Sequence, residues 1–288
     1  MEARSASARQ KILETQELPP LPNVAAELLM VLQADDDNEV ERLRVIVEQD
    51  PGLTARVMGW ANSAYFGTRG NVRTLDRAIF GVLGLRTVTS LILSIILNRA
   101  FNTQACPSFQ LEDYWFRALL TAHCARSGGA RAGGEQVDPE DAFLAGLLHN
   151  LGLLLLVHLF PGDMDAVLKE ANAPDDAVLR AAEQERLGID HAQAGAWLAQ
   201  RWHLPALVVD TISGYPQSPP TNSSSVVGLV GFSRNQVDRL LASRAKRAER
   251  VTLTVPDWLC VPREEWREVV VELLEHRDKL REQAQSLS

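Results

Sequence analysis

The segment Leu147–Phe160, LLHNLGLLLLVHLF, is the feature that most constrains the fold. It is apolar at almost every position, so a helix formed there must be covered by protein on all sides. It is shorter than the roughly 20 apolar residues that a helix needs to span a bilayer, and it contains His149, Asn150 and His158. Together with a second apolar run, Leu91–Leu97, it predicts buried core helices and not membrane spans.

Apolar residues recur at helical spacing along nearly the whole chain, and no convincing strand alternation appears. Asp50-Pro51 and Asp138-Pro139 each place an N-cap residue before a proline at the first helical position. Asn38 with Glu41 resembles a capping pair at the start of another helix. These signals predict an all-α fold.

Several boundaries follow from glycine and proline. Gly84 is expected to allow a sharp bend between two helices, and Gly188 to end a helix. A helix is expected over Leu111–Ser127, followed by a flexible loop in SGGARAGGEQ. On the helix after Asp190, Trp197 is expected to cover the core and Trp202 the surface.

The organisation expected from these boundaries has three parts: an N-terminal segment at 1–17, a helical domain at 18–215 and a C-terminal helical extension at 216–288. YPQSPPTNSSS is the clearest linker. The extension should contain helices at about 224–241 and 262–285. Trp258 and Trp266 carry too much apolar area to remain loose, so the extension should pack on the domain or on a partner.

The net charge and the cysteine spacing limit the classes of function that the chain can have. The chain of 288 residues has a formal net charge of −8, which disfavours broad nucleic-acid binding and anionic membrane surfaces. Its three cysteines, Cys106, Cys124 and Cys260, are far apart and form no CxxC pair, which argues against a disulfide framework or a structural zinc site. The first residues contain no apolar signal-peptide core. A cytoplasmic location is therefore expected.

Five motifs resemble the HDOD domain family, whose members are related to metal-dependent HD hydrolases but are found as signalling output modules in bacteria. They are the LPPLP segment, DPGLTARVMGWANSAYFG, AIFGVLGLRTV, AFLAGLLHNLG and DHAQAGAWLAQRWHLP. The resemblance covers about 18–215. Its most specific residues, in the second motif, are Asp50, Pro51, Asn62, Ser63 and Gly67.

The resemblance also implies where an HD hydrolase would hold its metal, with one histidine, an adjacent His-Asp pair and a later aspartate. Here His149 is followed by Asn150, and Arg117 lies near the first histidine position. Tyr215 stands where many HDOD proteins have a histidine, and Ser233 where the last aspartate is expected. We therefore expect a vestigial site at Arg117, His149, Asn150 and Tyr215, with no metal, no cofactor and no catalysis.

Structural roles account for most of the other polar residues. His149 is expected to be a buried neutral histidine that donates to a backbone carbonyl, and the polar atoms of His149 and Asn150 should be paired within the protein. Asn62-Ser63 should form a turn after a helix. Asp190 should cap a helix whose first turn contains His191.

A substitute metal site built from His123 and His149, with Asp141 or Glu140 as the carboxylate, is disfavoured. His123 lies six residues after Arg117 and on a different helix face, and Asp141 suits the first turn of its own helix.

Three functions remain open. The first is an output or adaptor module that binds an as yet unidentified protein partner in bacterial signalling. The second is a sensor of a cyclic dinucleotide or another small ligand, which would bind in the vestigial cleft or at a basic cluster formed by Arg244, Lys246, Arg247 and Arg250. The third is a divergent metal-dependent phosphodiesterase.

Overall fold

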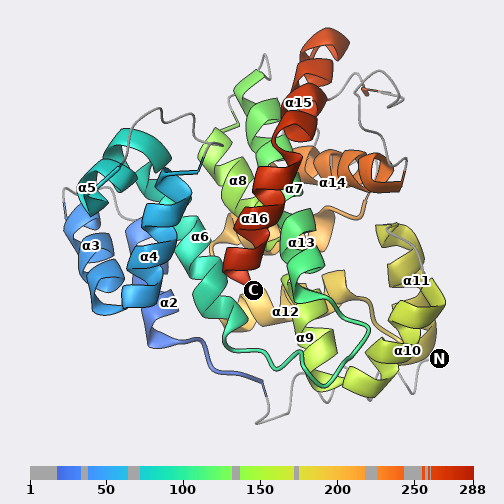
Figure 1. Ribbon diagram of the computed structural model, residues 1–288. Coiled ribbons are helices and arrows are strands. Elements are labelled where there is room, and N and C mark those ends of the chain that lie inside the picture. Colours follow the sequence, from blue (N-terminus) through green and yellow to red (C-terminus); the bar gives the residue numbers. More distant parts are fainter. Residues whose placement is uncertain are drawn as a thin grey trace.

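The computed structural model describes residues 18–33, 38–63, 72–131, 137–171, 175–217, 226–242, 255–256, 259 and 261–288. All regular structure in these ranges is helical, which confirms the predicted all-α fold (Figure 1). The first half of the chain forms α2 (Asn23–Gln33), α3 (Glu39–Gln49), α4 (Pro51–Ala61), α5 (Leu75–Ala78), the π-helical turn η2 (Ile79–Leu83), α6 (Leu85–Asn98) and α7 (Leu111–Arg131). The second half forms α8 (Pro139–Leu148), α9 (Leu151–Leu159), α10 (Pro161–Ala171), α11 (Asp176–Leu187), α12 (His191–Arg201), α13 (Ala206–Gly214), α14 (Val226–Ala242), α15 (Arg263–Glu275) and α16 (Arg277–Leu287).

The helices α2–α5 lie together on one side of the molecule, and α6 connects them to the central helix α7 (Figure 1). The Asp50 carboxylate caps α4 by accepting from the backbone N–H groups of Gly52 at 2.9 Å and Leu53 at 3.2 Å. The predicted start of this helix is therefore confirmed. Asn38 occupies the N-cap of α3 but makes no side-chain cap hydrogen bond, so the predicted capping pair is not formed there.

Asn62, the C-cap residue of α4, hydrogen-bonds both to its own helix and to Val72. Its side-chain amide donates to the carbonyls of Met58 and Val72 at 2.9 and 3.0 Å, and its Oδ1 accepts from the Val72 N–H at 2.8 Å. The structural role predicted for Asn62 is thus confirmed. The motif residues Asp50, Pro51, Asn62 and Ser63 all lie in or directly beside α4. Gly67 lies outside the described residues.

Gly84 produces the predicted bend. Its φ of +85° is a backbone conformation that favours glycine, and the helical segments before and after it meet at 111°. The π-helical turn directly before Gly84 was not predicted, because a single wider turn leaves no signature in the apolar spacing.

The central helix α7 is longer than predicted. Gly128 and Gly129 lie inside it and are buried, so the loop predicted from Ser127 onward is wrong as far as Arg131. The physical reason is tertiary packing: a Cβ atom at Gly128 would lie 2.2 Å from the ring of Trp266 on α15. The glycine makes room for that tryptophan, and the contact stabilises a helical segment of low intrinsic propensity.

The segment Pro139–Leu159, which contains α8 and α9, is long and apolar enough to cross a membrane by those two criteria alone. However, 94% of its most apolar window is buried by the rest of the protein. This agrees with the prediction of core helices around GLLHNLG.

The C-terminal extension packs on the domain, as predicted. Trp266 is completely buried, and Arg281 on α16 stacks its guanidinium 3.9 Å from the centre of the Phe116 ring on α7. The Trp60 indole on α4 donates to Ser286 Oγ at 2.8 Å, so α16 contacts the α2–α5 group as well as α7. The single helix predicted at 262–285 is in fact two helices that meet at His276. Trp258 lies outside the described residues.

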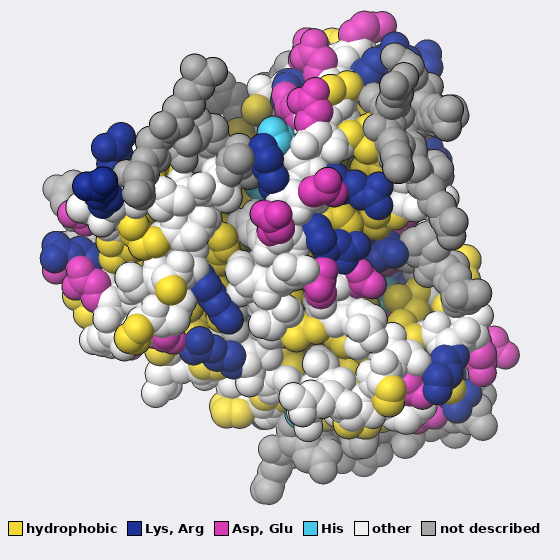
Figure 2. All heavy atoms as spheres, in the orientation of Figure 1, with side chains coloured by type: hydrophobic (Ala, Val, Ile, Leu, Met, Phe, Trp, Pro, Cys, Tyr) yellow, Lys and Arg dark blue, Asp and Glu magenta, His cyan; other side chains and the backbone are white. Residues whose placement is uncertain are grey.

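Charged side chains of both signs are interspersed on the face where α15 and α16 lie (Figure 2). The prediction for the two tryptophans at α12 holds only in part, because Trp197 packs against the core but Trp202, the C-cap residue, is not a surface residue. Trp202 is buried and donates to the Pro19 carbonyl at 3.0 Å, whereas Trp197 is only half-buried. The LPPLP segment is the unforeseen partner that covers Trp202.

Candidate functional site

His149 and Asn150 lie at the junction of α8 and α9, in the centre of the molecule. Two positions later, Gly152 crosses Gly195 of α12 at backbone contact distance. A Cβ atom at Gly152 would lie 1.8 Å from the His191 carbonyl and 2.4 Å from the Gly195 nitrogen. This close approach places the N-terminus of α12, and with it His191, next to the α8–α9 junction.

His149 is a buried, neutral histidine, as predicted. Its Nδ1 donates to the Gly146 carbonyl at 2.7 Å. Burial, and secondarily the positive charge of Arg234, lower the pKa of His149 to about 3. Its ring packs edge-on against the ring of Tyr215, with centroids 5.0 Å apart.

The prediction that all polar atoms of His149 and Asn150 are paired is wrong. Within the described part of the chain, His149 Nε2 and Asn150 Oδ1 are buried and have no hydrogen-bond partner. Asn150 occupies the N-cap of α9 without making a cap hydrogen bond. Asn150 is also one of the residues that line a pocket described below.

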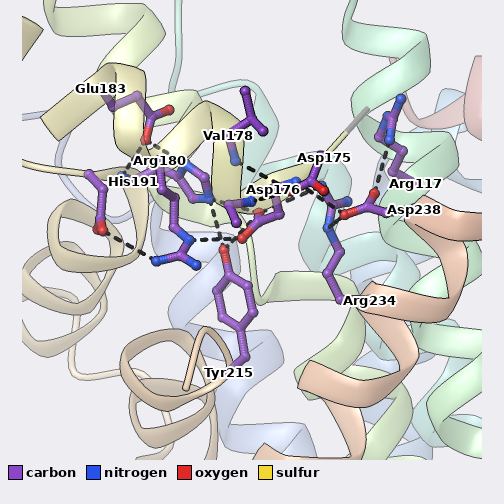
Figure 3. A network of polar contacts seen from close by, with 12 residues as sticks. Arg117, Asp175, Asp176, Val178, Arg180, Glu183, His191, Tyr215, Arg234 and Asp238 are labelled. Carbon is purple, nitrogen blue, oxygen red and sulfur yellow. Dashed lines mark hydrogen bonds and ion pairs between the residues drawn. The ribbon is translucent and has the colours of Figure 1, made fainter. Parts of the chain in front are cut away.

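His191 is held between two buried carboxylates (Figure 3). Its Nδ1 donates to Glu183 Oε2 at 2.7 Å, and its Nε2 lies 2.8 Å from the Tyr215 hydroxyl and 3.2 Å from Asp176 Oδ1. Burial opposes the charged imidazolium, but the charge of Glu183 and the hydrogen bonds to Asp176 and Glu183 raise the pKa of His191 to about 10. His191 is therefore a positively charged imidazolium at neutral pH.

Asp190 caps α12 through a complete capping box, so this part of the prediction is confirmed. His191 does lie in the first turn, but the sequence did not indicate its partners. The two carboxylate partners come from α11, fifteen and eight residues earlier in the chain, and the hydroxyl partner Tyr215 is the C-cap residue of α13.

Asp176 joins this histidine to a group of arginines. Its carboxylate accepts from Arg180 at 2.9 Å and from the Tyr215 hydroxyl at 3.2 Å, and it lies 3.6 Å from Arg234. Although burial opposes ionisation, the hydrogen bond and charge of His191, followed by the charge of Arg234, hold the pKa of Asp176 far below its ordinary value. Asp176 is therefore a buried anion surrounded by cations.

Asp238 on α14 occupies the second acidic position of the network. It lies 3.1 Å from Arg117 on α7 and 3.3 Å from Arg234 on its own helix, and it accepts from the Asp176 backbone N–H at 3.2 Å (Figure 3). Burial raises the pKa of Asp238 to about 6 in spite of the two guanidinium groups. Arg234 is 4% exposed and is the cation shared by both aspartates.

The residues that could have formed a substitute metal site do not meet. His123 packs edge-on against Phe143, while Glu140 pairs with Arg126 at 3.0 Å and Asp141 with Arg86. Among the described residues, no three histidine, cysteine, aspartate or glutamate side chains are arranged to hold a metal ion. The donor set therefore does not fit the metal of an HD hydrolase.

The protonation states also bear on acid–base chemistry. A base that works near neutral pH needs a pKa close to that range. His149, with a pKa of about 3, is too weak a base, and His191, with a pKa of about 10, keeps its proton. Asp238, with a pKa of about 6, is the group of the network nearest that range, but its carboxylate is paired with Arg117 and Arg234.

The structure brings together Arg117, His149, Asn150 and Tyr215, which the sequence placed in one vestigial site. It adds six residues that sequence reasoning missed: Asp176, Arg180, Glu183, His191, Arg234 and Asp238. A usable signal existed in GLVGFSRNQVDRLL, where Arg234 and Asp238 stand four apart in a largely apolar helix. The basic cluster of Arg244, Lys246, Arg247 and Arg250 lies outside the described residues.

A pocket opens beside this network. It has a volume of about 170 Å³ and lies among α7, the N-terminal ends of α9 and α11, and α14. The polar residues that line it are Ser108, Gln110, Asp113, Tyr114, Arg117, Asn150, Asp175 and Arg234. We call it the cleft pocket.

The HDOD domain family profile matches residues 18–217. Among curated proteins, an uncharacterized protein from Treponema pallidum (strain Nichols) is 29% identical over 219 residues, which is 75% of this chain and 41% of the relative. This chain thus spans less than half of the length of that relative.

Solved structures resemble the whole chain. A candidate signal transduction protein from Marinobacter aquaeolei VT8 has a TM-score of 0.78 at 27% identity, over 99% of this chain and 66% of that one. A candidate phosphohydrolase from Shewanella amazonensis SB2B has a TM-score of 0.71 at 26% identity, over 98% of both chains. An HDOD domain protein of unknown function from Geobacter sulfurreducens shares the fold, with a TM-score of 0.74 at 22% identity, over 100% of this chain and 99% of that one.

Proposed function

Because this chain belongs to the HDOD domain family, we propose that it is a non-hydrolytic signal-transduction module that acts by binding a protein partner. Such proteins are related to HD phosphohydrolases, so the proposal has to explain why this chain would not hydrolyse phosphoesters. The observation that carries it is Arg234, a buried guanidinium between the two aspartates Asp176 and Asp238.

A guanidinium in this position supplies the positive charge that a metal would otherwise supply. Two buried carboxylates without a cation would be strongly destabilised. Arg234 compensates both, and its charge contributes to the low pKa of His149. A divalent ion would have to displace or closely approach this fixed cation, at a site that offers Asn150 in place of a carboxylate. An arginine cannot generate hydroxide from water as a metal does.

Exposed apolar side chains support the interaction role. In the described residues, Met30 on α2, Val45 on α3 and Phe80 on η2 are 62%, 42% and 52% exposed, and all three belong to the N-terminal helical group. Large apolar side chains at the surface are frequent in protein-binding faces. This group of helices is therefore the proposed binding face.

The non-hydrolytic part is tested with the purified chain. Elemental analysis is expected to find no stoichiometric iron, manganese or zinc, and added manganese should give no hydrolysis of bis(p-nitrophenyl) phosphate or of a cyclic dinucleotide. The double variant Arg117→His, Asn150→Asp restores two residues of the HD pattern but keeps Arg234, and it should also remain inactive. Metal-dependent turnover by the unaltered chain would establish the divergent phosphodiesterase instead.

The interaction part is tested by affinity capture from the source cells. Phe80→Glu should abolish recovery of a specific partner without changing the melting temperature, because the side chain is half exposed. Val178→Glu is the matched control, since Val178 is 46% exposed but lies on α11, far from that group in the chain. Equal recovery with Phe80→Glu and the unaltered chain would remove the N-terminal helices as the binding face.

A further inference from the structure

Three residues that line the cleft pocket carry buried polar atoms without a hydrogen-bond partner among the described residues. These atoms are the Tyr114 hydroxyl, Asn150 Oδ1, and Nε and Nη1 of Arg234. The three residues come from α7, the α8–α9 junction and α14, they are 5%, 5% and 4% exposed, and all line the same pocket. Unsatisfied buried groups are costly and rare in native proteins, so three residues with such groups around one pocket require an explanation.

From this arrangement we infer that the cleft pocket binds a small oxyanion, a single phosphate or carboxylate group. Arg234 Nη1 supplies a charged N–H donor, and the planar guanidinium suits oxyanions. The Tyr114 hydroxyl can donate a second hydrogen bond. Asn150 lies beside them, and its side-chain amide can offer an acceptor or a donor, so it suits a hydroxyl or an oxygen of the bound group.

The two carboxylates at the pocket do not oppose an anion strongly, because each is already engaged. Asp113 is paired with Arg281 and is 57% exposed at the side chain, where water screens it. Asp175 caps α11 by accepting from the N–H groups of Ala177 at 2.8 Å and Val178 at 3.3 Å, so the helix terminus offsets its charge. Arg117, on the same wall, adds a second guanidinium.

The size of the pocket limits the ligand. A volume of about 170 Å³ is below the roughly 300 Å³ at which sites for drug-sized ligands begin. A cyclic dinucleotide would therefore not be enclosed there, whereas inorganic phosphate or a short carboxylic acid would. The inference rests on the proposed function in one respect, namely that Arg234 and not a metal ion forms the centre of the site.

The test measures binding of inorganic phosphate and of acetate to the full chain by calorimetry and by thermal shift, with chloride at equal ionic strength as the reference. At least one of the two oxyanions should stabilise the protein. Stabilisation by phosphate would identify a phosphate group as the ligand, and stabilisation by acetate a carboxylate group. Tyr114→Phe should weaken its affinity about tenfold, the effect of one hydrogen bond to a charged group. It should leave the melting temperature of the ligand-free protein unchanged or raised, because the lost hydroxyl has no protein partner.

Thr211→Val is the matched control. It removes another buried hydroxyl without a partner, on α13 and outside the pocket wall, and should bind the oxyanion as the unaltered chain does. Equal affinity in Tyr114→Phe, or no binding of either oxyanion, would overturn the inference and leave a pocket filled by water only. Metal content is measured on the same samples. A metal-loaded protein would refute the proposed function as well, whereas a metal-free protein that binds neither oxyanion would refute the inference alone.

Discussion

Replacing His191 with glutamine tests whether the His191 side chain, which lies between Glu183 and Asp176, is a charged imidazolium in the folded protein. The substitution removes the charge and leaves the Glu183 carboxylate, which is fully buried, without its counter-ion. Removing one partner of a buried ion pair typically costs about 3–5 kcal/mol. The pKa of His191 gives a similar figure: a rise from 6.5 to about 10 corresponds to roughly 4 kcal/mol at pH 7.

The sign of the pH dependence follows from the raised pKa. The stabilisation is fully present below pH 6.5, the ordinary value, and is lost progressively as the pH rises toward about 10. The difference in the free energy of unfolding between the unaltered chain and His191→Gln should therefore shrink between pH 7 and pH 10. Below pH 6.5 other groups contribute, because burial lowers the pKa values of His149 and His123 to about 3.

The assay is urea denaturation at several pH values, combined with a double-mutant cycle. Glu183→Gln should cost a similar amount, and the double variant His191→Gln, Glu183→Gln should cost clearly less than the sum of the two single losses. A loss of less than about 1 kcal/mol in His191→Gln, or a loss that does not depend on pH, would show that His191 is neutral and that the network is held together differently.

Three further predictions concern packing and the Asn150 position. Gly152→Ala should destabilise the chain by more than about 3 kcal/mol, because its Cβ would meet the backbone of α12; Gly59→Ala, which meets nothing within 4 Å, should be neutral or stabilising by up to about 1 kcal/mol. Leu53→Ala should cost about 2–5 kcal/mol in a denaturant melt, since Leu53 is 1% exposed, and an unchanged melt would contradict its core position. Asn150→Asp should cost about 1–3 kcal/mol near neutral pH and should not create manganese-dependent phosphodiesterase activity; a variant stabilised by manganese would show that Arg234 does not exclude the metal.

Local signals in the sequence were sufficient for the fold class and for several helix boundaries. Asp50-Pro51, Asp138-Pro139, Gly84 and Gly188 act through their own backbone conformation and a few neighbouring atoms, so their effects can be predicted without the rest of the chain. The same holds for the burial of Leu147–Phe160, because an apolar run of that length has to be covered wherever it lies.

Predictions failed where a distant segment decides the outcome. From the sequence, Gly128 was predicted to lie in a loop, but packing against Trp266 keeps it in a helix. Trp202 was predicted to lie at the surface, but the segment at Pro19 covers it. Neither partner is near in the sequence, and helix propensity alone cannot anticipate a contact formed by packing.

In the candidate site, too, local sequence predicted some features and contacts between distant segments decided the others. From its resemblance to the HDOD family, the sequence by itself predicted that His149 and Asn150 occupy the place of the His-Asp pair of an HD hydrolase, and its apolar pattern predicted that both are buried. Only the tertiary structure decided that His191 is a charged partner of Glu183 and Asp176, and that Arg234 joins Asp176 to Asp238. The physical reason is that the ionisation of a buried group depends on which charges surround it within a few ångströms, and here those charges come from α7, α11, α12 and α14, which only folding brings together.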